Sequence, residues 1–347
     1  MINSLTKGFK MKAFCVFNNK GGVGKTTLLC NLAAHYALRG NKKVLVVDAD
    51  PQCNATAYMF KEKVLDDLYS SSKDGETINQ LVTSLKKSKG YSDIPIKKSE
   101  SFGVDVVPGD PRFSLAEDFL AKDWVDATSG QERGLKTTFL FRALLEWASQ
   151  KKYDYVFFDI GPSLGAINRT VLLSCDYFIL PMSSDIFSLR GLQNIEVAIT
   201  SWTKGLERGL TSYKEDNNED FLFDGLHQRN PQGIKFLGYV TQQYTAKTVA
   251  GKKQPVDAYE KIIKRIGPAI KKSLIEKINQ GKVLEYKLGE IPYFSSLVPM
   301  AQTSTKPIFM LKSADGVVGA HFDKVKQFEK VISDIATSLS VNMNEIN

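Results

Sequence analysis

A short glycine-rich stretch, residues 20–27, strongly constrains how this 347-residue chain can fold. It reads Lys-Gly-Gly-Val-Gly-Lys-Thr-Thr, it follows an apolar, β-prone run at residues 13–17, and a helix pattern over residues 28–39 comes after it. The glycines allow the backbone to wrap around a polyphosphate with its N–H groups aimed inward, and the helix adds the positive end of its dipole. Strand, glycine loop and helix in this order indicate a phosphate-binding loop, in which Lys25 reaches the terminal phosphates and Thr26 places its hydroxyl on Mg²⁺.

The spacing of this loop departs from the ordinary pattern. Gly-x-x-x-x-Gly-Lys-[Ser/Thr] fits residues 19–26 only if Asn19 replaces the first glycine, and a second lysine, Lys20, lies five residues before Lys25. This arrangement resembles the deviant Walker A box of the ParA/MinD ATPases, a superfamily of P-loop NTPases. The resemblance implies that Lys20 contacts nucleotide across a homodimer.

Acidic residues follow two other apolar runs. Asp48 and Asp50 come after the run at residues 43–47, and Asp159 ends the run at residues 155–159. Because α/β folds bind ligands at the C-terminal ends of parallel strands, we expect Asp48 and Asp50 to approach the phosphate site. An apolar run that ends in aspartate is the Walker B pattern, whose carboxylate accepts hydrogen bonds from water on Mg²⁺.

Further segments resemble the ParA/Soj branch of that superfamily. Residues 48–56 look like its Walker A′ box, and residues 159–165 look like its Asp-x-Pro-Pro-Ser-x-Gly segment, with Gly161 in place of the first proline. The resemblance implies that ATP and Mg²⁺ are the cofactors and that the nucleotide-binding residues are Lys20, Gly21, Gly22, Val23, Gly24, Lys25, Thr26, Thr27 and Pro292. It implies metal-site roles for Thr26, Asp48 and Asp159 and catalytic roles for Lys20, Lys25 and Asp50. Asp50 would position the attacking water, although spacing alone does not separate its role from that of Asp48.

The resemblance implies an α/β fold with a doubly wound, mostly parallel sheet and helices on both faces. We expect a single domain over residues 1–347, because the resemblance covers most of the chain in patches. An apolar stripe predicts a C-terminal helix over about residues 314–340. The runs that read as strands are residues 12–18, 43–47, 103–107, 155–159, 175–181, 233–242 and 289–293.

Two polar stretches interrupt this pattern, at about residues 61–103 and 203–232. We expect both to be polar inserts, and we expect the first to be mainly exposed loop with a short helix over residues 77–82. A further helix is predicted from about residue 257, with a break or kink at residues 267–268, where glycine precedes proline.

The formal net charge of +8 and the isoelectric point near 9.0 favour contact with an anionic polymer or surface. In the helix that begins near residue 257, basic side chains fall opposite a stripe of isoleucines. This basic face is either an ordinary solvated surface or a stripe that contacts the phosphate backbone of DNA. The candidate DNA-contacting residues are Lys247, Lys252, Lys253, Lys261, Lys264, Arg265 and Lys272.

Two functions agree best with these patterns. The resemblance implies a ParA-like ATPase that forms a homodimer on ATP, binds DNA without sequence specificity, and hydrolyses ATP slowly until a ParB-like or other protein stimulates it. Such a protein acts in plasmid or chromosome partition or positions another cargo. The alternative is an ATPase switch for a dedicated protein partner, in a mobile-element or defence system, which the two inserts favour.

Two further classes fit less well. A MinD-like ATPase that cycles on membranes needs a basic amphipathic terminal helix, but residues 340–347 have no basic face. No apolar run reaches the roughly 18 residues of a transmembrane helix, so we expect no membrane contact. An iron–sulphur reductase component needs paired cysteines, whereas the four cysteines here are scattered and suit a reducing cytoplasm. The expected location is therefore cytoplasmic, on the nucleoid if DNA is bound.

Overall fold

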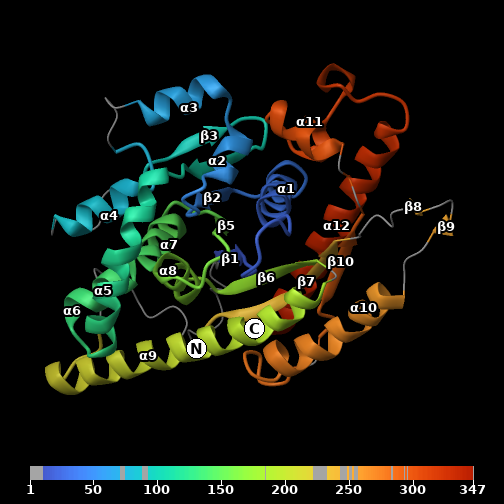
Figure 1. Ribbon diagram of the computed structural model, residues 1–347. Coiled ribbons are helices and arrows are strands. Elements are labelled where there is room, and N and C mark those ends of the chain that lie inside the picture. Colours follow the sequence, from blue (N-terminus) through green and yellow to red (C-terminus); the bar gives the residue numbers. More distant parts are fainter. Residues whose placement is uncertain are drawn as a thin grey trace, which may run out of the picture.

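An eight-stranded sheet crosses the molecule in the order β10-β7-β6-β1-β5-β2-β4-β3 (Figure 1). The computed structural model describes residues 11–70, 75–87, 93–183, 185–221, 233–242, 248–249, 252–253, 257–282, 284–292, 294 and 296–346. The strands are β1 (Lys12–Val16), β2 (Val44–Asp48), β3 (Lys97–Ser99), β4 (Val104–Val107), β5 (Tyr155–Asp159), β6 (Tyr177–Ser183), β7 (Lys235–Gln242) and β10 (Lys287–Ile291). Neighbouring strands are parallel except for β3, which pairs antiparallel with β4 at one edge.

The central strand β1 shows why both faces of the sheet are covered. Successive side chains of a strand point to opposite faces, and β1 is apolar on both. Phe14 and Val16 belong to one buried core, whereas Ala13 and Cys15 belong to the other. Each core needs its own layer of helices, and the predicted doubly wound, mostly parallel sheet is confirmed.

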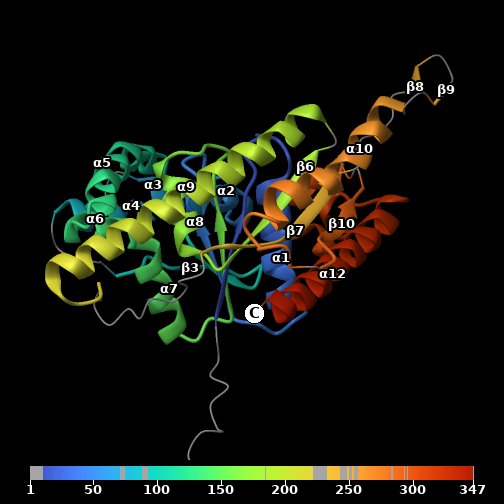
Figure 2. The ribbon, with the colours of Figure 1, turned by 90° about the horizontal axis from the view of Figure 1, so that it is seen from below.

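Helices from distant parts of the chain form the two layers (Figures 1 and 2). The first core is covered by α1 (Lys25–Leu38), α2 (Asn54–Met59), α11 (Leu297–Thr303) and α12 (His321–Ile346). The second core is covered by α4 (Asn79–Lys86), α5 (Ala116–Thr128), α7 (Leu140–Gln150), α8 (Ala166–Ser174), α9 (Ile186–Asn217) and α10 (Asp257–Ile270). A short antiparallel pair, β8 (Thr248–Val249) and β9 (Lys252–Lys253), lies away from the main sheet.

The first polar stretch, residues 61–103, is not mainly exposed loop as predicted. It contains α3 (Glu62–Tyr69), α4 and the edge strand β3. Leu68 of α3 and Leu81 of α4 are buried. Apolar side chains three and four residues apart give each short helix one buried face, which is how a polar sequence can still fold onto the core.

The second stretch, residues 203–232, was predicted only to be a polar insert. The 32-residue helix α9 continues through Asn217, so the first half of this insert is helical. Leu206, Leu210 and Tyr213 recur at helical spacing and join a small apolar cluster with Leu135 of α6 (Glu132–Thr138). This packing extends the helix beyond the point where its sequence becomes polar.

Two smaller expectations are corrected near the C-terminus. Pro268 lies inside α10, so of the break or kink predicted at residues 267–268 only the break is wrong, and a π-helical turn follows at Lys271–Ile275. The last helix begins at His321 rather than near residue 314. Gly316 and Gly319, which precede it, have left-handed φ angles of 91° and 52°, and such angles do not continue a right-handed helix. Within the described part of the chain, no helix combines the length and apolar character that crossing a membrane requires.

Candidate functional site

The glycine loop connects the C-terminal end of β1 to the first turn of α1. Gly22 and Gly24 adopt left-handed φ angles of 73° and 74°, which side chains disfavour. Apart from the neighbouring residues in the chain, no atom of the described residues lies within 4 Å of where a Cβ would stand on Gly21 or Gly22. The loop therefore offers open space beside its backbone, at the positive end of a 14-residue helix. This is the arrangement that a phosphate group requires.

Lys25 is the first residue of α1 and is largely buried. Its Nζ donates a hydrogen bond to the Lys20 carbonyl oxygen at 3.3 Å. Burial lowers the pKa of Lys25, and the nearby charges of Asp159 and Asp50 partly offset this effect. This ammonium is buried beside the glycine loop, where little water competes with an anion, so it is suited to bind a phosphate group.

Two aspartates stand side by side at the ends of β2 and β5. Asp48 pairs in register with Asp159, and both are fully buried. Thr26 Oγ1 donates to Asp159 Oδ2 at 2.8 Å, and Asp48 Oδ2 accepts from Thr56. Burial raises the pKa of Asp48 to about 7 and that of Asp159 well above its ordinary value, and the charge of Asp48 adds to the effect on Asp159.

Each of these aspartates keeps one oxygen for a further partner. Asp48 Oδ1 and Asp159 Oδ1 are buried and form no hydrogen bond with any described residue. Together with the Thr26 hydroxyl they make an oxygen donor set that fits Mg²⁺, an ion that keeps several waters and binds one or two carboxylates. Among the described residues no group of three or more His, Cys, Asp or Glu could hold a metal ion.

Asp50 lies beside the segment that follows β5. A Cβ on Gly161 would stand 3.3 Å from Asp50 Oδ1, so the absence of a side chain leaves room for this carboxylate. Asp50 Oδ1 also accepts a hydrogen bond from Gln52 N at 3.0 Å. Asn168 also binds this segment, because its Nδ2 donates to the carbonyl oxygens of Gly161 at 2.7 Å and Ser163 at 2.6 Å. Sequence reasoning missed Asn168, whose amide alone gave no signal.

Lys20 makes its contacts within its own chain. Its Nζ forms an ion pair with Asp185 and donates to Ser183 Oγ at 3.2 Å. The backbone N–H of Lys20 donates to Asn18 Oδ1 at 3.1 Å, and Asn18 Nδ2 in turn donates to the Pro181 carbonyl at 2.7 Å. Both sets of bonds tie the loop to the C-terminal end of β6.

A cavity of about 210 Å³ opens beside the loop. The structure places the predicted Pro292 in its wall, together with Gly22, Gly24, Thr27, Leu28, Gln242, Ile291, Phe294, Val298 and Phe328. Gln242 Nε2 donates to the Val23 carbonyl at 2.9 Å. Gln242 was not predicted, although it ends a strand at the same edge of the sheet as the aspartates. The apolar side chains of this wall suit a flat aromatic base.

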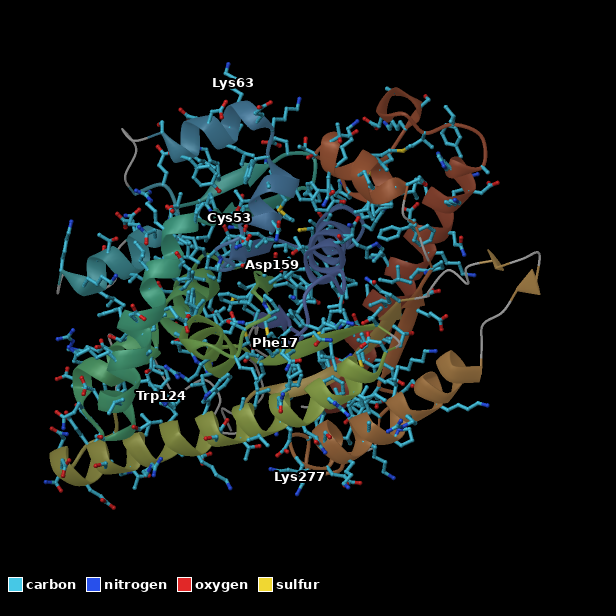
Figure 3. All side chains as sticks on the ribbon, viewed as in Figure 1. Phe17, Cys53, Lys63, Trp124, Asp159 and Lys277 are labelled. Atoms are coloured by element: carbon cyan, nitrogen blue, oxygen red, sulfur yellow. The ribbon has the colours of Figure 1, made fainter. Side chains whose placement is uncertain are left out.

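The structure describes the side chains of only some of the predicted basic residues. Lys247 is outside the described residues, and so are the side chains of Lys252, Lys253 and Lys261. Lys264 and Arg265 of α10 and Lys272 of the following turn are exposed. In Figure 3, Lys277 of this region lies at one edge of the molecule, Asp159 at the centre and Lys63 at the opposite edge.

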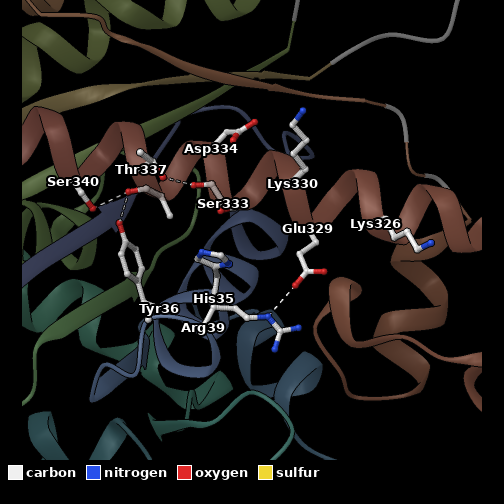
Figure 4. Close-up of a pocket in the computed structure, with 12 residues that line it drawn as sticks. His35, Tyr36, Arg39, Lys326, Glu329, Lys330, Ser333, Asp334, Thr337 and Ser340 are labelled. Atoms are coloured by element: carbon white, nitrogen blue, oxygen red, sulfur yellow. Dashed lines mark hydrogen bonds and ion pairs between the residues drawn. The ribbon is translucent and has the colours of Figure 1, made fainter.

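A second hollow, of about 660 Å³, lies between α1 and α12 (Figure 4). Tyr36 donates to the Ala336 carbonyl at 3.0 Å, and Arg39 pairs with Glu329 at 2.9 Å. These bonds join the last turns of α1 to α12. The 14-residue helix α1 spans about 21 Å, so the hollow lies at the end of α1 that is far from the glycine loop. None of the predicted nucleotide-binding residues lines it.

Known proteins are similar to this chain over most of its length. The AAA domain family model matches residues 11–211. The virulence plasmid ParA family protein pGP5-D of Chlamydia psittaci is 32% identical over 246 residues, which are 70% of this chain and 80% of that protein. The sporulation initiation inhibitor protein Soj of Bacillus subtilis is 30% identical over 236 residues, which are 68% and 81%. The crystal structure of protein DIP2308 from Corynebacterium diphtheriae matches with a TM-score of 0.73 and 28% identity, over 96% of this chain and 99% of that one.

Proposed function

The chain belongs to the AAA domain family and is a ParA/MinD-like P-loop ATPase, and on this premise we propose that it is a dimerising, Mg-ATP-dependent ATPase of the ParA type that binds DNA without sequence specificity in its ATP state. Partition of a plasmid or chromosome, or the positioning of another cargo, is the process that such a cycle serves. One observation carries the proposal: the phosphate loop, Lys25 and three aspartates from two other strand ends lie together at one edge of the sheet.

Each residue of this site has a separate role in the proposed transfer of the terminal phosphoryl group to water. Lys25 and the loop N–H groups neutralise charge on the terminal phosphates. Thr26, Asp48 and Asp159 would hold Mg²⁺, which would supply further neutralisation of the developing charge. Asp50 orients the attacking water and accepts its proton, a role supported by its position beside the segment after β5. ATP is the nucleotide that this set of groups suits, with its base in the cavity beside Pro292.

Dimerisation completes the site. The Lys20 side chain belongs to the loop yet pairs with Asp185 of its own chain rather than with the metal-site aspartates. We infer that Lys20 leaves this contact and adds its charge to the nucleotide of a partner subunit. Hydrolysis is then slow in the monomer, and a ParB-like or other stimulating protein resets the dimer. A cytoplasmic location, on the nucleoid when DNA is bound, follows from this cycle.

DNA binding is supported by the net charge of +8 and by the exposed side chains of Lys264, Arg265 and Lys272. Neutralising phosphates releases counterions, so the affinity should fall steeply as salt concentration rises. No base-reading geometry is needed for a surface of this kind.

The test is retardation of duplex DNA of arbitrary sequence with ATP, with ADP and without nucleotide, over a series of salt concentrations. We expect retardation with ATP, and the double variant Lys264→Glu/Arg265→Glu should weaken it and make the salt slope shallower by about 2. The matched control is Lys61→Glu/Lys63→Glu, which changes the same charge on the exposed residues beside and within α3. No retardation at low salt with ATP, combined with binding to anionic liposomes, would support a MinD-like membrane cycle instead.

A dedicated protein partner is the second candidate function. It is favoured by the folded segment of α3, α4 and β3, which extends the sheet at its β4 edge. ATP-dependent dimerisation without any DNA retardation or liposome binding would support this candidate over the first.

A further inference from the structure

Thr56, in the first turn of α2, joins the Asp48 carboxylate to the loop that follows β4. Its Oγ1 donates to Asp48 Oδ2 at 2.6 Å and accepts from Gly109 N at 2.8 Å, and its own N–H donates to the same Asp48 oxygen at 2.7 Å. An amide nitrogen can only donate, so the single hydroxyl proton is directed to Asp48. Thr56 is 0% exposed, so bulk water does not compete for these bonds.

These bonds determine which oxygen of Asp48 remains available. Both donors reach Oδ2, whereas Oδ1 is buried and has no hydrogen-bond partner among the described residues. Turning the carboxylate would break both bonds in a buried place, where a hydrogen-bonding group left without a partner is unfavourable. Thr56 therefore holds Asp48 in one orientation before any ligand arrives.

The packing against Gly109 restricts Asp48 from the other side. A Cβ on Gly109 would stand 2.9 Å from both Cγ and Oδ2 of Asp48 and 3.0 Å from Cys53 Sγ. Only a residue without a side chain allows the loop backbone to approach this closely. The Asp48 carboxylate is thus held between the Thr56 hydroxyl and the backbone of Gly109, and neither residue belongs to the phosphate loop.

We propose that Thr56 is a positioning residue of the magnesium site, whose hydroxyl holds Asp48 so that Oδ1 faces the water shell of the ion. The inference rests on the proposed function, because it concerns how that same site takes Mg²⁺. Residues that orient a metal-binding side chain without touching the metal commonly change metal affinity by about 10–100-fold when they are mutated.

The experiment compares Thr56→Val, which keeps the shape of the side chain, with Thr56→Ser, which keeps the hydroxyl. Binding of a fluorescent, non-hydrolysable ATP analogue is titrated with Mg²⁺ and repeated in EDTA. We expect the apparent Mg²⁺ affinity to fall about 10–100-fold in Thr56→Val and to be largely restored in Thr56→Ser, whereas binding in EDTA is unchanged in both.

The matched control is Thr170→Val, which removes another buried hydroxyl, one that donates to the Ala166 carbonyl at 2.9 Å. It should leave the Mg²⁺ affinity unchanged. If Thr56→Val does not fold, Gly109→Ala is the second variant, because its Cβ would displace Asp48, and it should show the same loss. Wild-type Mg²⁺ affinity in the folded Thr56→Val or Gly109→Ala protein overturns the inference. Failure of the wild-type protein to bind the analogue would instead overturn the proposed function.

Discussion

Lys20 and Asp185 form an ion pair within one chain that links the phosphate loop to the end of β6. Their side chains are 37% and 31% exposed, so the pair lies at the surface, where such contacts contribute about 0–1 kcal/mol. One ammonium group cannot hold Asp185 and also reach a nucleotide in a second subunit. The proposed dimer therefore has to break this pair.

Asp185→Asn should favour the ATP-dependent dimer. The variant removes the charge that holds Lys20 in each of the two subunits, and because both pairs are partly exposed we expect dimerisation to strengthen by no more than about 30-fold. The dimer dissociation constant can be measured by light scattering after size exclusion, with a non-hydrolysable ATP analogue and over a range of protein concentrations. A dimer weaker than that of the wild type would mean that Asp185 supports the interface instead.

Lys20→Ala should lose ATP-dependent dimerisation and reduce hydrolysis by roughly 100-fold, because one preorganised charge at the transition state is missing. The affinity of the monomer for ATP should change little, since Lys25 remains. Steady-state turnover and calorimetric titration separate the two effects. Wild-type turnover in a protein that stays monomeric with ATP would refute the role of Lys20 across the dimer.

Asp50→Ala should bind ATP and remain in the ATP-bound dimer, with single-turnover hydrolysis slower by about 100-fold or more, as expected when a general base is removed. The control Asp66→Ala removes an exposed carboxylate of α3 and should hydrolyse ATP at the normal rate. An unchanged rate in Asp50→Ala would assign the water-positioning role to another residue.

The stability of the nucleotide-free protein should fall as pH rises. The pKa of Asp48 is raised from 3.8 to about 7, so this carboxyl group binds a proton more tightly in the folded than in the unfolded chain. Its contribution to stability is complete below pH of about 4 and is lost as pH rises through about 7. Urea unfolding between about pH 5 and pH 8 should show this loss, on the order of a few kcal/mol at most.

Asp48→Asn should make that pH dependence shallower, whereas Asp66→Asn, which changes an exposed aspartate, should not. Mg-ATP should also reduce the dependence, because bound cation stabilises the ionised carboxylate. The same slope in Asp48→Asn as in the wild type would show that Asp48 does not titrate in this range.

Gln242→Ala should weaken ATP binding by about 2–10-fold, because the Val23 carbonyl loses its side-chain donor and such a bond contributes about 0.5–1.5 kcal/mol. Isothermal titration measures the affinity, and Gln150→Ala, at the exposed end of α7, is the control. Equal affinities in the two variants would exclude Gln242 from supporting the loop.

Local signals in the sequence predicted the sheet and much of the candidate site. The glycine loop depends on consecutive residues, and Asp48, Asp50 and Asp159 were located because each follows an apolar run that reads as a strand. Parallel strands bring such ends to one edge, so a local pattern is enough to place these groups together. Pro292 was located only through the family resemblance.

Contacts between distant segments could not be read in this way. Lys20 and Asp185 are 165 residues apart, and Val23 and Gln242 are 219 apart. The extent of α9 was also missed, because burial of Leu206 against α6 stabilises a helix whose sequence has already become polar.

The sequence by itself determined that the chain has a phosphate loop and aspartates at strand ends, since these follow from residue type and short spacing, and its resemblance to a known family implied the α/β fold with helices on both faces of the sheet. Only the tertiary structure decided that Lys20 is paired with Asp185, that Gln242 supports the loop and that Thr56 holds Asp48. The physical reason is that hydrogen bonds and ion pairs require atoms within about 3–4 Å. Which distant side chains come that close depends on how all the strands and helices pack together.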